Sequence, residues 1–232
     1  MYEDLKHRVW EANLKLVEYG LVILTFGNVS QVDREKGVMA IKPSGVSYEQ
    51  MKPQDMVVLD LNGQQLEGRL QPSSDTPTHL FLYTHFPGIG GIAHAHSEYA
   101  TAFAQAGEEI PCLGTTHADF FPGPIPSTRE LEEGEVLSDY EQNTGKVIVE
   151  RFKNLDPAHY PACLVAGHGP FAWGQSGAEA VDHLLALEKI AKMALLTRLA
   201  KPGAKNLPAY LIKKHFERKH GPKAYYGQRK EK

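Results

Sequence analysis

His94 and His96, with one alanine between them, are the residues of this chain whose types and spacing most clearly suit metal chemistry. Side chains of an extended strand alternate between its two faces, so these two imidazoles are expected on the same face. Imidazole nitrogen is a good ligand for zinc and its first-row neighbours. An isolated His-x-His is about as often a polar pair on a solvent-facing strand, so a metal site requires further ligands elsewhere in the chain.

Asp75 and His168 are the best candidates for these further ligands. Asp75 stands in a loop before an expected helix, and His168 lies between two glycines, where a metal or a substrate can approach closely. His79 is an alternative to Asp75, because the two would share a helix face if the helix began early. Ordinary roles, as a loop cap for Asp75 and a turn residue for His168, remain open. Three histidines and one carboxylate would hold a zinc-like ion and leave room for substrate oxygen atoms.

Three polar turns form a second group of candidate residues, at positions 27–30, 42–45 and 72–74. Each turn offers hydroxyls, amides or free backbone N–H groups. The third precedes an expected helix N-terminus, where the dipole and the unpaired N–H groups favour a phosphate. Each turn alone is a weak signal, because such turns are common in loops, but together they suggest an anion-binding region beside the metal site.

The composition is that of an ordinary globular protein, with 42% hydrophobic and 23% charged residues among 232. A formal net charge of −3 gives no general attraction to nucleic acid or to an anionic membrane. Only two cysteines occur, no apolar secretory segment is visible at the N-terminus, and no run has the length of a membrane span. We therefore expect a cytoplasmic protein. The basic residues near the C-terminus are interpreted as a solvated tail.

Hydrophobic periodicity and turn signals indicate short strands interleaved with helices. Helices are expected at residues 2–19, 77–85 with Thr76 as the cap, 99–106 and 177–199 and in the second half of 130–153. Strands are expected at 38–41, 56–61, 163–166 and 171–173 and in the histidine segment that follows the turn at 87–91. Residues 110–126 are rich in glycine, proline and threonine and are expected to be irregular. No repeat or linker divides the chain. The pattern predicts one α/β domain with a mixed or antiparallel sheet covered by helices.

Seven segments, taken together and in this order, resemble the class II aldolase and adducin superfamily. They are residues 27–30, 42–45, 72–79, 94–97, 115–119, 167–174 and 219–228. Within the superfamily they are most similar to the epimerases of L-ribulose 5-phosphate. Ala95 stands where close relatives carry threonine, and the residue before Gly167 also differs, but neither change removes a ligand. Residues 229–232 extend past the usual end of the family.

The resemblance implies a single catalytic domain over residues 1–232, with a central, mostly antiparallel sheet covered by helices on both sides. It implies a zinc site, which would also accept manganese or cobalt. The matching metal ligands are Asp75, His94, His96 and His168. The positions that match phosphate-binding residues are Asn28, Lys42, Ser44, Gly45, Ser73 and Ser74, and His215 matches a residue placed near the substrate phosphate.

Asp119 and Tyr226 match the family's acid and base residues. In the family these reach the metal from a neighbouring subunit of a fourfold-symmetric homotetramer, so the tail from about residue 208 is expected to contribute to a neighbouring subunit's site. Spacing alone would favour simpler roles, a loop cap for Asp119 and a packing residue for Tyr226. The expected partners are therefore a phosphorylated ketopentose and further copies of this chain, with no nucleic acid and no membrane.

The implied reaction is the metal-dependent interconversion of L-ribulose 5-phosphate and D-xylulose 5-phosphate. Because the hydrogen on C4 is not acidic, inversion is expected through cleavage of the C3–C4 bond, rotation of glycolaldehyde phosphate and recondensation. Asp119 and Tyr226 would each carry a proton at the C4 oxygen, one on each face. The substrate belongs to both arabinose and ascorbate degradation.

Two alternative functions stay open. The first is a class II aldolase acting on another ketose phosphate, which Asp75 disfavours because the aldolases carry glutamate at the matching position. The second is a non-catalytic binding domain like the adducin head, which would be expected to have lost ligands.

Overall fold

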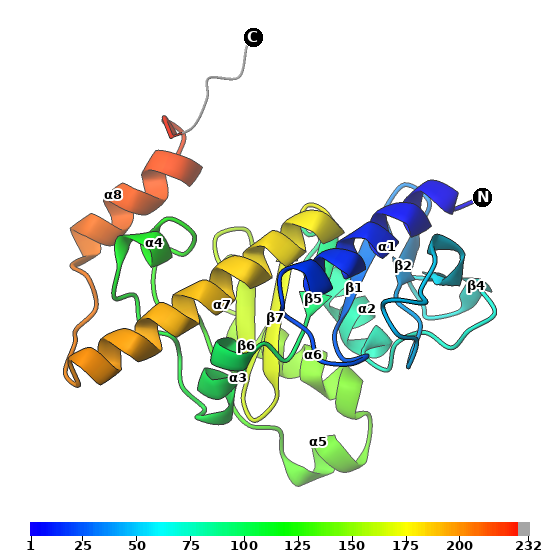
Figure 1. Ribbon diagram of the computed structural model, residues 1–232, viewed down its shortest axis with the longest axis horizontal. Coiled ribbons are helices and arrows are strands. Elements are labelled where there is room, and N and C mark those ends of the chain that lie inside the picture. Colours follow the sequence, from blue (N-terminus) through cyan, green and yellow to red (C-terminus); the bar gives the residue numbers. More distant parts are fainter. Residues whose placement is uncertain (227–232) are drawn as a thin grey trace.

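The computed structural model describes residues 1–226 and contains one sheet (Figure 1). Its strand order is β4-β3-β2-β1-β5-β7-β6, and every neighbouring pair is antiparallel. The strands are β1 (Asn28–Asp33), β2 (Val38–Ile41), β3 (Val57–Asp60), β4 (Gln65–Glu67), β5 (Gly91–His94), β6 (Ala162–Val165) and β7 (Gly169–Gly174). The expected antiparallel sheet is therefore confirmed.

The helices are distributed over both faces of this sheet. They are α1 (Glu3–Glu18), α2 (Thr76–His85), α3 (Glu98–Gln105), α4 (Thr115–Ala118), α5 (Glu133–Leu137), α6 (Tyr140–Arg151), α7 (Gly177–Ala200) and α8 (Ala209–His220), with a short 3-10 helix, η1, at Pro53–Asp55. Helices α1, α3 and α7 pack on one face, and α2 and α6 pack on the other.

Alternation along the central strands explains how one sheet supports two cores. In β5, Ala93 packs with the helices α1, α3 and α7, whereas the neighbouring Ile92 packs with α2 and α6. In β7, Ala172 packs in the first of these cores and Trp173 packs in the second. Small residues on the first face and large ones on the second let α7 lie close to the sheet, and the central strands are buried throughout.

Most elements lie where the sequence places them. The bounds of β2 agree with expectation, and α7 extends one residue further. Gly20 and Gly107, which follow α1 and α3, both have a φ of 66°, the left-handed conformation that ends many helices. No helix in the described part of the chain has the length and apolar character needed to cross a membrane.

Three expectations are wrong in detail. Thr76 is the first residue of α2 rather than its cap, and Asp75 occupies the cap position. The segment expected to be irregular contains α4, a single turn of helix. The basic segment interpreted as a solvated tail forms α8, which packs on α4 through Ile212. Because α8 buries only this residue, its sequence lacks the apolar stripe that identifies longer helices. Residues 229–232 and the last two of the motif at 219–228 lie outside the described residues.

Candidate metal centre

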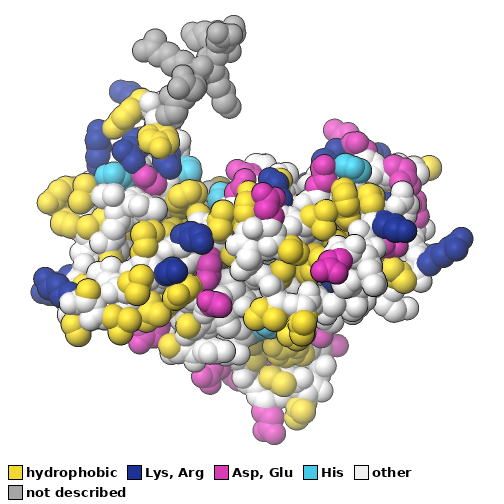
Figure 2. Space-filling view, in the orientation of Figure 1, with side chains coloured by type: hydrophobic (Ala, Val, Ile, Leu, Met, Phe, Trp, Pro, Cys, Tyr) yellow, Lys and Arg dark blue, Asp and Glu magenta, His cyan; other side chains and the backbone are white. Residues whose placement is uncertain are grey.

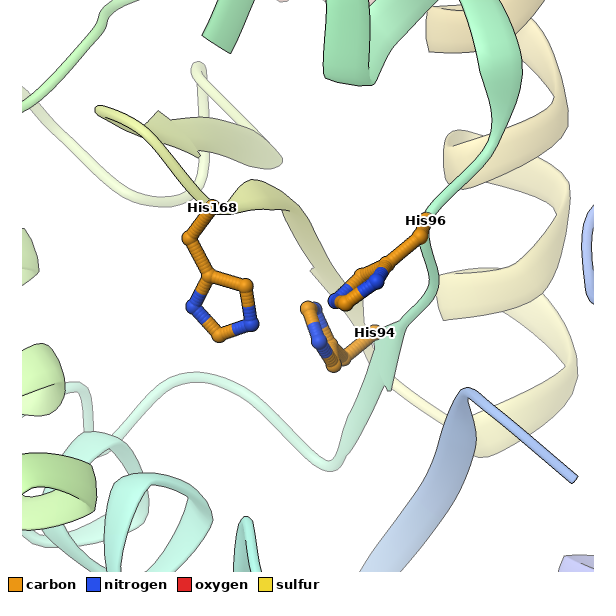
Figure 3. Close-up of side chains that lie close together, drawn as sticks. All are labelled: His94, His96 and His168. Atoms are coloured by element: carbon orange, nitrogen blue, oxygen red, sulfur yellow. The ribbon is translucent and has the colours of Figure 1, made fainter. Parts of the chain in front are cut away.

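Three histidine rings converge in the structure (Figure 3). The ring centroids of His94 and His96 are 5.0 Å apart, those of His94 and His168 are 4.8 Å apart, and those of His96 and His168 are 5.0 Å apart. One nitrogen from each ring lies within 4.8 Å of those of the other two. Three imidazoles in this arrangement suit a zinc-like ion that keeps open positions for substrate.

The sheet brings these histidines together from separate parts of the sequence. His94 is the last residue of β5, and His96 lies just beyond the strand. His168 stands in the turn between β6 and β7, after Gly167, which has a φ of 70°. Because β5 and β7 run antiparallel with His94 opposite Phe171, the end of one strand meets the beginning of the other. The pairing therefore places His168 beside the histidine pair.

The surroundings of His96 and His168 favour the neutral imidazole, which is the form that binds metal, and a hydrogen bond orients His94. The Nδ1 of His94 lies 2.9 Å from the carbonyl oxygen of Pro170. A carbonyl only accepts, so Nδ1 carries the hydrogen and Nε2 keeps its lone pair for a metal. Burial, with contributions from the two neighbouring imidazoles, lowers the pKa of His168 to about 3. Burial also lowers the pKa of His96.

Asp75 lies next to the histidines without belonging to the close cluster. Its carboxylate caps no backbone N–H of α2 and instead accepts a hydrogen bond of 2.6 Å from the amide of Asn28. Burial works to raise the pKa of Asp75, but the imidazoles of His94 and His79 and the Asn28 bond bring it below its usual value. In the described residues, the atoms within 4.8 Å of one another come from His94, His96 and His168 alone.

His79, the alternative to Asp75, makes a different set of contacts. Its Nδ1 lies 2.7 Å from the hydroxyl of Ser30, which is also 2.8 Å from the hydroxyl of Tyr83. The ring is fully buried, and burial lowers its pKa to about 3. Asp75 is the N-cap of α2, and its carbonyl accepts a hydrogen bond of 3.1 Å from the backbone N–H of His79, so the two residues are one helical turn apart. His79 lies outside the histidine cluster.

The three polar turns predicted to bind an anion lie together. The backbone N–H of Ser73 donates to the carbonyl of Lys42 over 3.0 Å, and that of Ser44 donates to the carbonyl of Gln71 over 2.9 Å. These two segments therefore run antiparallel, with a bridge between Pro43 and Pro72. The turn at 27–30 is linked to the segment after 72–74 through the hydrogen bond from Asn28 to Asp75. Ser44, Gly45 and Ser74 are exposed, and Ser73 is half-buried.

Lys42 supplies this region with a buried positive charge. The residue is 2% exposed, and its ammonium donates to the carbonyls of Thr25 and Pro43 over 3.2 and 3.3 Å and lies 4.8 Å from the Tyr48 ring centroid. No carboxylate in residues 1–226 forms an ion pair with it. Burial lowers the pKa of Lys42 to about 8. An anion near this amine would stabilise its charged form.

Asp119 belongs to a different group of residues, between α4 and α8. Its carboxylate accepts hydrogen bonds of 3.0 and 2.7 Å from the Arg218 guanidinium and one of 3.0 Å from Nδ1 of His215, and the Lys219 ammonium is 3.8 Å away. Partial burial opposes ionisation, but the bonds from Arg218 and His215 keep the pKa of Asp119 below its usual value. None of these bonds involves the histidine cluster.

Tyr226 lies in the same group and is 61% exposed. Its ring is 5.0 Å from the Arg218 guanidinium and 4.5 Å from the Lys219 ammonium. Figure 1 shows α4 and α8 together beyond one side of the sheet, and Figure 2 shows Lys and Arg side chains gathered over α8. Contacts with α8 therefore bring together three of the predicted site residues, His215, Asp119 and Tyr226.

Two residues near the site were not identified from the sequence. Glu188 is 7% exposed, and its carboxylate accepts hydrogen bonds of 2.9 Å from the backbone N–H groups of Tyr99 and Ala100, at the start of the helix that follows His96. Its position on the apolar face of α7 was a usable signal. The hydroxyl of Tyr140 lies 3.4 Å from Nδ1 of His168, and nothing in the local sequence marks it.

Comparisons with known proteins agree with this geometry. The family model of the class II aldolase and adducin N-terminal domain matches residues 7–195. L-ribulose-5-phosphate 4-epimerase UlaF of Salmonella paratyphi A is 55% identical over 227 residues, which are 98% of this chain and 100% of that protein, and the Salmonella typhi protein of the same name gives the same values. The solved structure of an L-fuculose 1-phosphate aldolase superimposes with a TM-score of 0.79 and 31% identity, covering 93% of this chain and 95% of its own. The resemblance seen in the motifs is confirmed, and the chain belongs to the class II aldolase and adducin N-terminal domain family.

Proposed function

We propose that this protein is a metal-dependent epimerase that interconverts L-ribulose 5-phosphate and D-xylulose 5-phosphate. The observation that carries the proposal is the 55% identity to curated epimerases along their whole length, 100% of each. The three converging histidines support it, because they would provide a metal site for this reaction.

The donor set fits zinc, and manganese or cobalt would also bind it. His94, His96 and His168 would supply three neutral nitrogens, and Asp75, which is next to them, would supply a carboxylate oxygen. When bound, the ion provides positive charge that stabilises negative charge developing on the substrate oxygen atoms. This assignment is supported by the bond from His94 to Pro170, which leaves Nε2 free.

The polar turns would hold the substrate phosphate during the reaction. The Lys42 ammonium is the buried cation of this region, and the hydroxyls of Ser44, Ser73 and Ser74 and the backbone N–H of Gly45 would add hydrogen-bond donors. One N–H of Asn28 is engaged by Asp75, and its second N–H is the one available to a phosphate oxygen. Anchoring the phosphate would keep the aldehyde fragment in place while it turns to present its other face.

Proton transfer at the C4 oxygen would be performed by Asp119 and Tyr226. An ionised Asp119 would accept the hydroxyl proton as the C3–C4 bond breaks, and Tyr226 would return a proton to the aldehyde oxygen on the opposite face as the bond reforms. Both contact residues of α8, and none of their hydrogen bonds or ring contacts within residues 1–226 involves His94, His96 or His168. That separation supports a homotetramer in which the segment from about residue 208 completes a neighbouring subunit's site, where His215 would lie near the phosphate.

A class II aldolase acting on another ketose phosphate is the second candidate. The likeness to an L-fuculose 1-phosphate aldolase, at 31% identity, favours it. The greater identity to the epimerases, 55%, and the aspartate rather than glutamate at position 75 favour the first candidate.

Incubation with L-ribulose 5-phosphate tests the proposal directly. The expected product is D-xylulose 5-phosphate, with turnover lost after chelation and regained with zinc, manganese or cobalt. Lasting release of glycolaldehyde phosphate and dihydroxyacetone would overturn the epimerase in favour of an aldolase. Absence of turnover together with absence of bound metal would support a binding domain like the adducin head.

A further inference from the structure

Asn28 lies at the junction of the two segments that carry the expected metal ligands. It is the first residue of β1, it is 2% exposed, and its Cα is paired with that of His94 across the antiparallel strands β1 and β5. Its amide nitrogen lies 2.6 Å from Oδ2 of Asp75, at the start of α2. One buried side chain therefore lies beside one expected ligand and is bonded to another.

The orientation of the Asn28 amide follows from chemistry. A carboxylate oxygen only accepts, so the atom facing Asp75 must be the nitrogen, and the other side-chain atom is the carbonyl oxygen. That oxygen is buried and has no hydrogen-bond partner in the described part of the chain. The bond to Asp75 is therefore the one side-chain hydrogen bond that Asn28 makes within residues 1–226, and it orients the amide.

The same bond fixes the Asp75 carboxylate. Within residues 1–226, Asn28 is the one side chain that donates a hydrogen bond to it, and the carboxylate makes no cap bond to α2. With Oδ2 engaged, Oδ1 is the oxygen left to approach a metal held by the histidines. Removal of Asn28 would leave the carboxylate free to rotate away from that position.

We infer that Asn28 is a positioning residue of the metal centre, acting through Asp75, and not only a phosphate-binding residue. The inference rests on the proposed function in one respect, that Asp75 is a ligand of the bound metal. Hydrogen-bond partners of metal ligands typically change metal affinity about 10- to 100-fold when they are removed. An effect of this size on metal affinity is not expected from a residue that contacts phosphate alone.

The test measures the dissociation constant of Zn²⁺ or Co²⁺ by competition with a chromogenic chelator, without substrate. Asn28→Ala is expected to weaken metal binding about 10- to 100-fold, and Asn28→Val, which suits a buried strand, provides a second variant if the alanine protein does not fold. Lys42→Met is the matched control for the phosphate region and is expected to change metal affinity less than about twofold. Binding of inorganic phosphate is measured in parallel.

A double-mutant cycle decides whether Asn28 acts through Asp75. In the Asp75→Ala background, Asn28→Ala is expected to cause no further loss of metal affinity. An unchanged metal affinity in Asn28→Ala, with weaker phosphate binding only, would overturn the inference while leaving the proposed function intact. An equal loss in both backgrounds, or an equal loss in Lys42→Met, would also overturn it. A wild-type protein that binds no divalent metal would overturn both proposals.

Discussion

Replacing Glu188 with glutamine tests how the fold supports the segment after the histidine pair. The Glu188 carboxylate, on α7, accepts hydrogen bonds of 2.9 Å from the second and third residues of α3, Tyr99 and Ala100. It is almost completely buried and takes the place of an N-cap side chain, because Ser97 makes no cap bond. Helix α3 begins two residues after His96, so this carboxylate holds the backbone next to that proposed ligand.

The magnitude follows from the number and type of these bonds. A hydrogen bond to a charged acceptor contributes about 1.5–3 kcal/mol, and the positive end of a helix dipole adds about 0.3–1 kcal/mol. Glutamine keeps the volume and one neutral bond but turns an NH₂ group toward the other backbone N–H, which is left unpartnered. We therefore expect Glu188→Gln to lower the free energy of unfolding by about 3 kcal/mol, or Tm by about 6–12 °C.

The assay is thermal and urea unfolding of the metal-free protein, because bound metal would add its own stabilisation. Asp182→Asn is the matched control, since Asp182 is an exposed carboxylate on the same helix whose one side-chain contact is a 3.5 Å approach to the Tyr19 hydroxyl. This variant is expected to change stability by less than about 0.5 kcal/mol. If Glu188→Gln unfolds within about 2 °C of the wild type, the capping account of this carboxylate is refuted.

Three further predictions concern the metal, the phosphate and the packing of α2. In the chelator competition, His168→Ala is expected to lower metal affinity more than about 100-fold, which is more than the loss expected for a residue that only supports a ligand. An unchanged metal affinity would show that His168 is not a ligand. Phosphate affinity is expected to fall as pH rises above about 8, where Lys42 loses its proton, and calorimetry should show a weaker fall in Lys42→Arg, which stays charged. Gly145→Ala is expected to destabilise by about 1–3 kcal/mol in urea unfolding although alanine favours helices, because its Cβ would lie 2.9 Å from Cβ of Phe81; a stabilised variant would show that α2 moves freely.

Elements governed by local pattern were predictable from the sequence. Helix α7 was recognised by its apolar spacing. The ends of α1 and α3 were marked by Gly20 and Gly107, which have a left-handed φ in the structure. The antiparallel sheet followed from short strands and hairpin turns. The order of its strands was not predictable, because pairing β1 with β5 and β5 with β7 depends on contacts between distant segments.

The candidate site likewise contains residues that the local sequence reveals and residues that it does not. The His-x-His pair and the glycine-flanked His168 were recognisable as possible ligands because their local surroundings suit a metal. The choice between Asp75 and His79 depended on where α2 begins. The sequence predicted Thr76 as the cap, whereas in the structure Asp75 is the cap and the helix begins at Thr76, one residue earlier than expected. The positioning role proposed for Asn28 has no mark in the sequence, since its hydrogen-bond partner, Asp75, belongs to another element.

The C-terminal helix shows why charged segments are the hardest to interpret. A run of basic residues with one buried apolar side chain is typical of a solvated surface, and α8 has that composition. Besides the packing of Ile212, α8 is held by the carboxylate of Asp119, the residue that follows α4, because Arg218, His215 and Lys219 all contact it. Arg218 and Lys219 also lie over the ring of Tyr226. The two cations that contact Asp119 therefore also contact the ring of Tyr226, so the two proposed proton carriers, far apart in the sequence, belong to one group of contacts on α8.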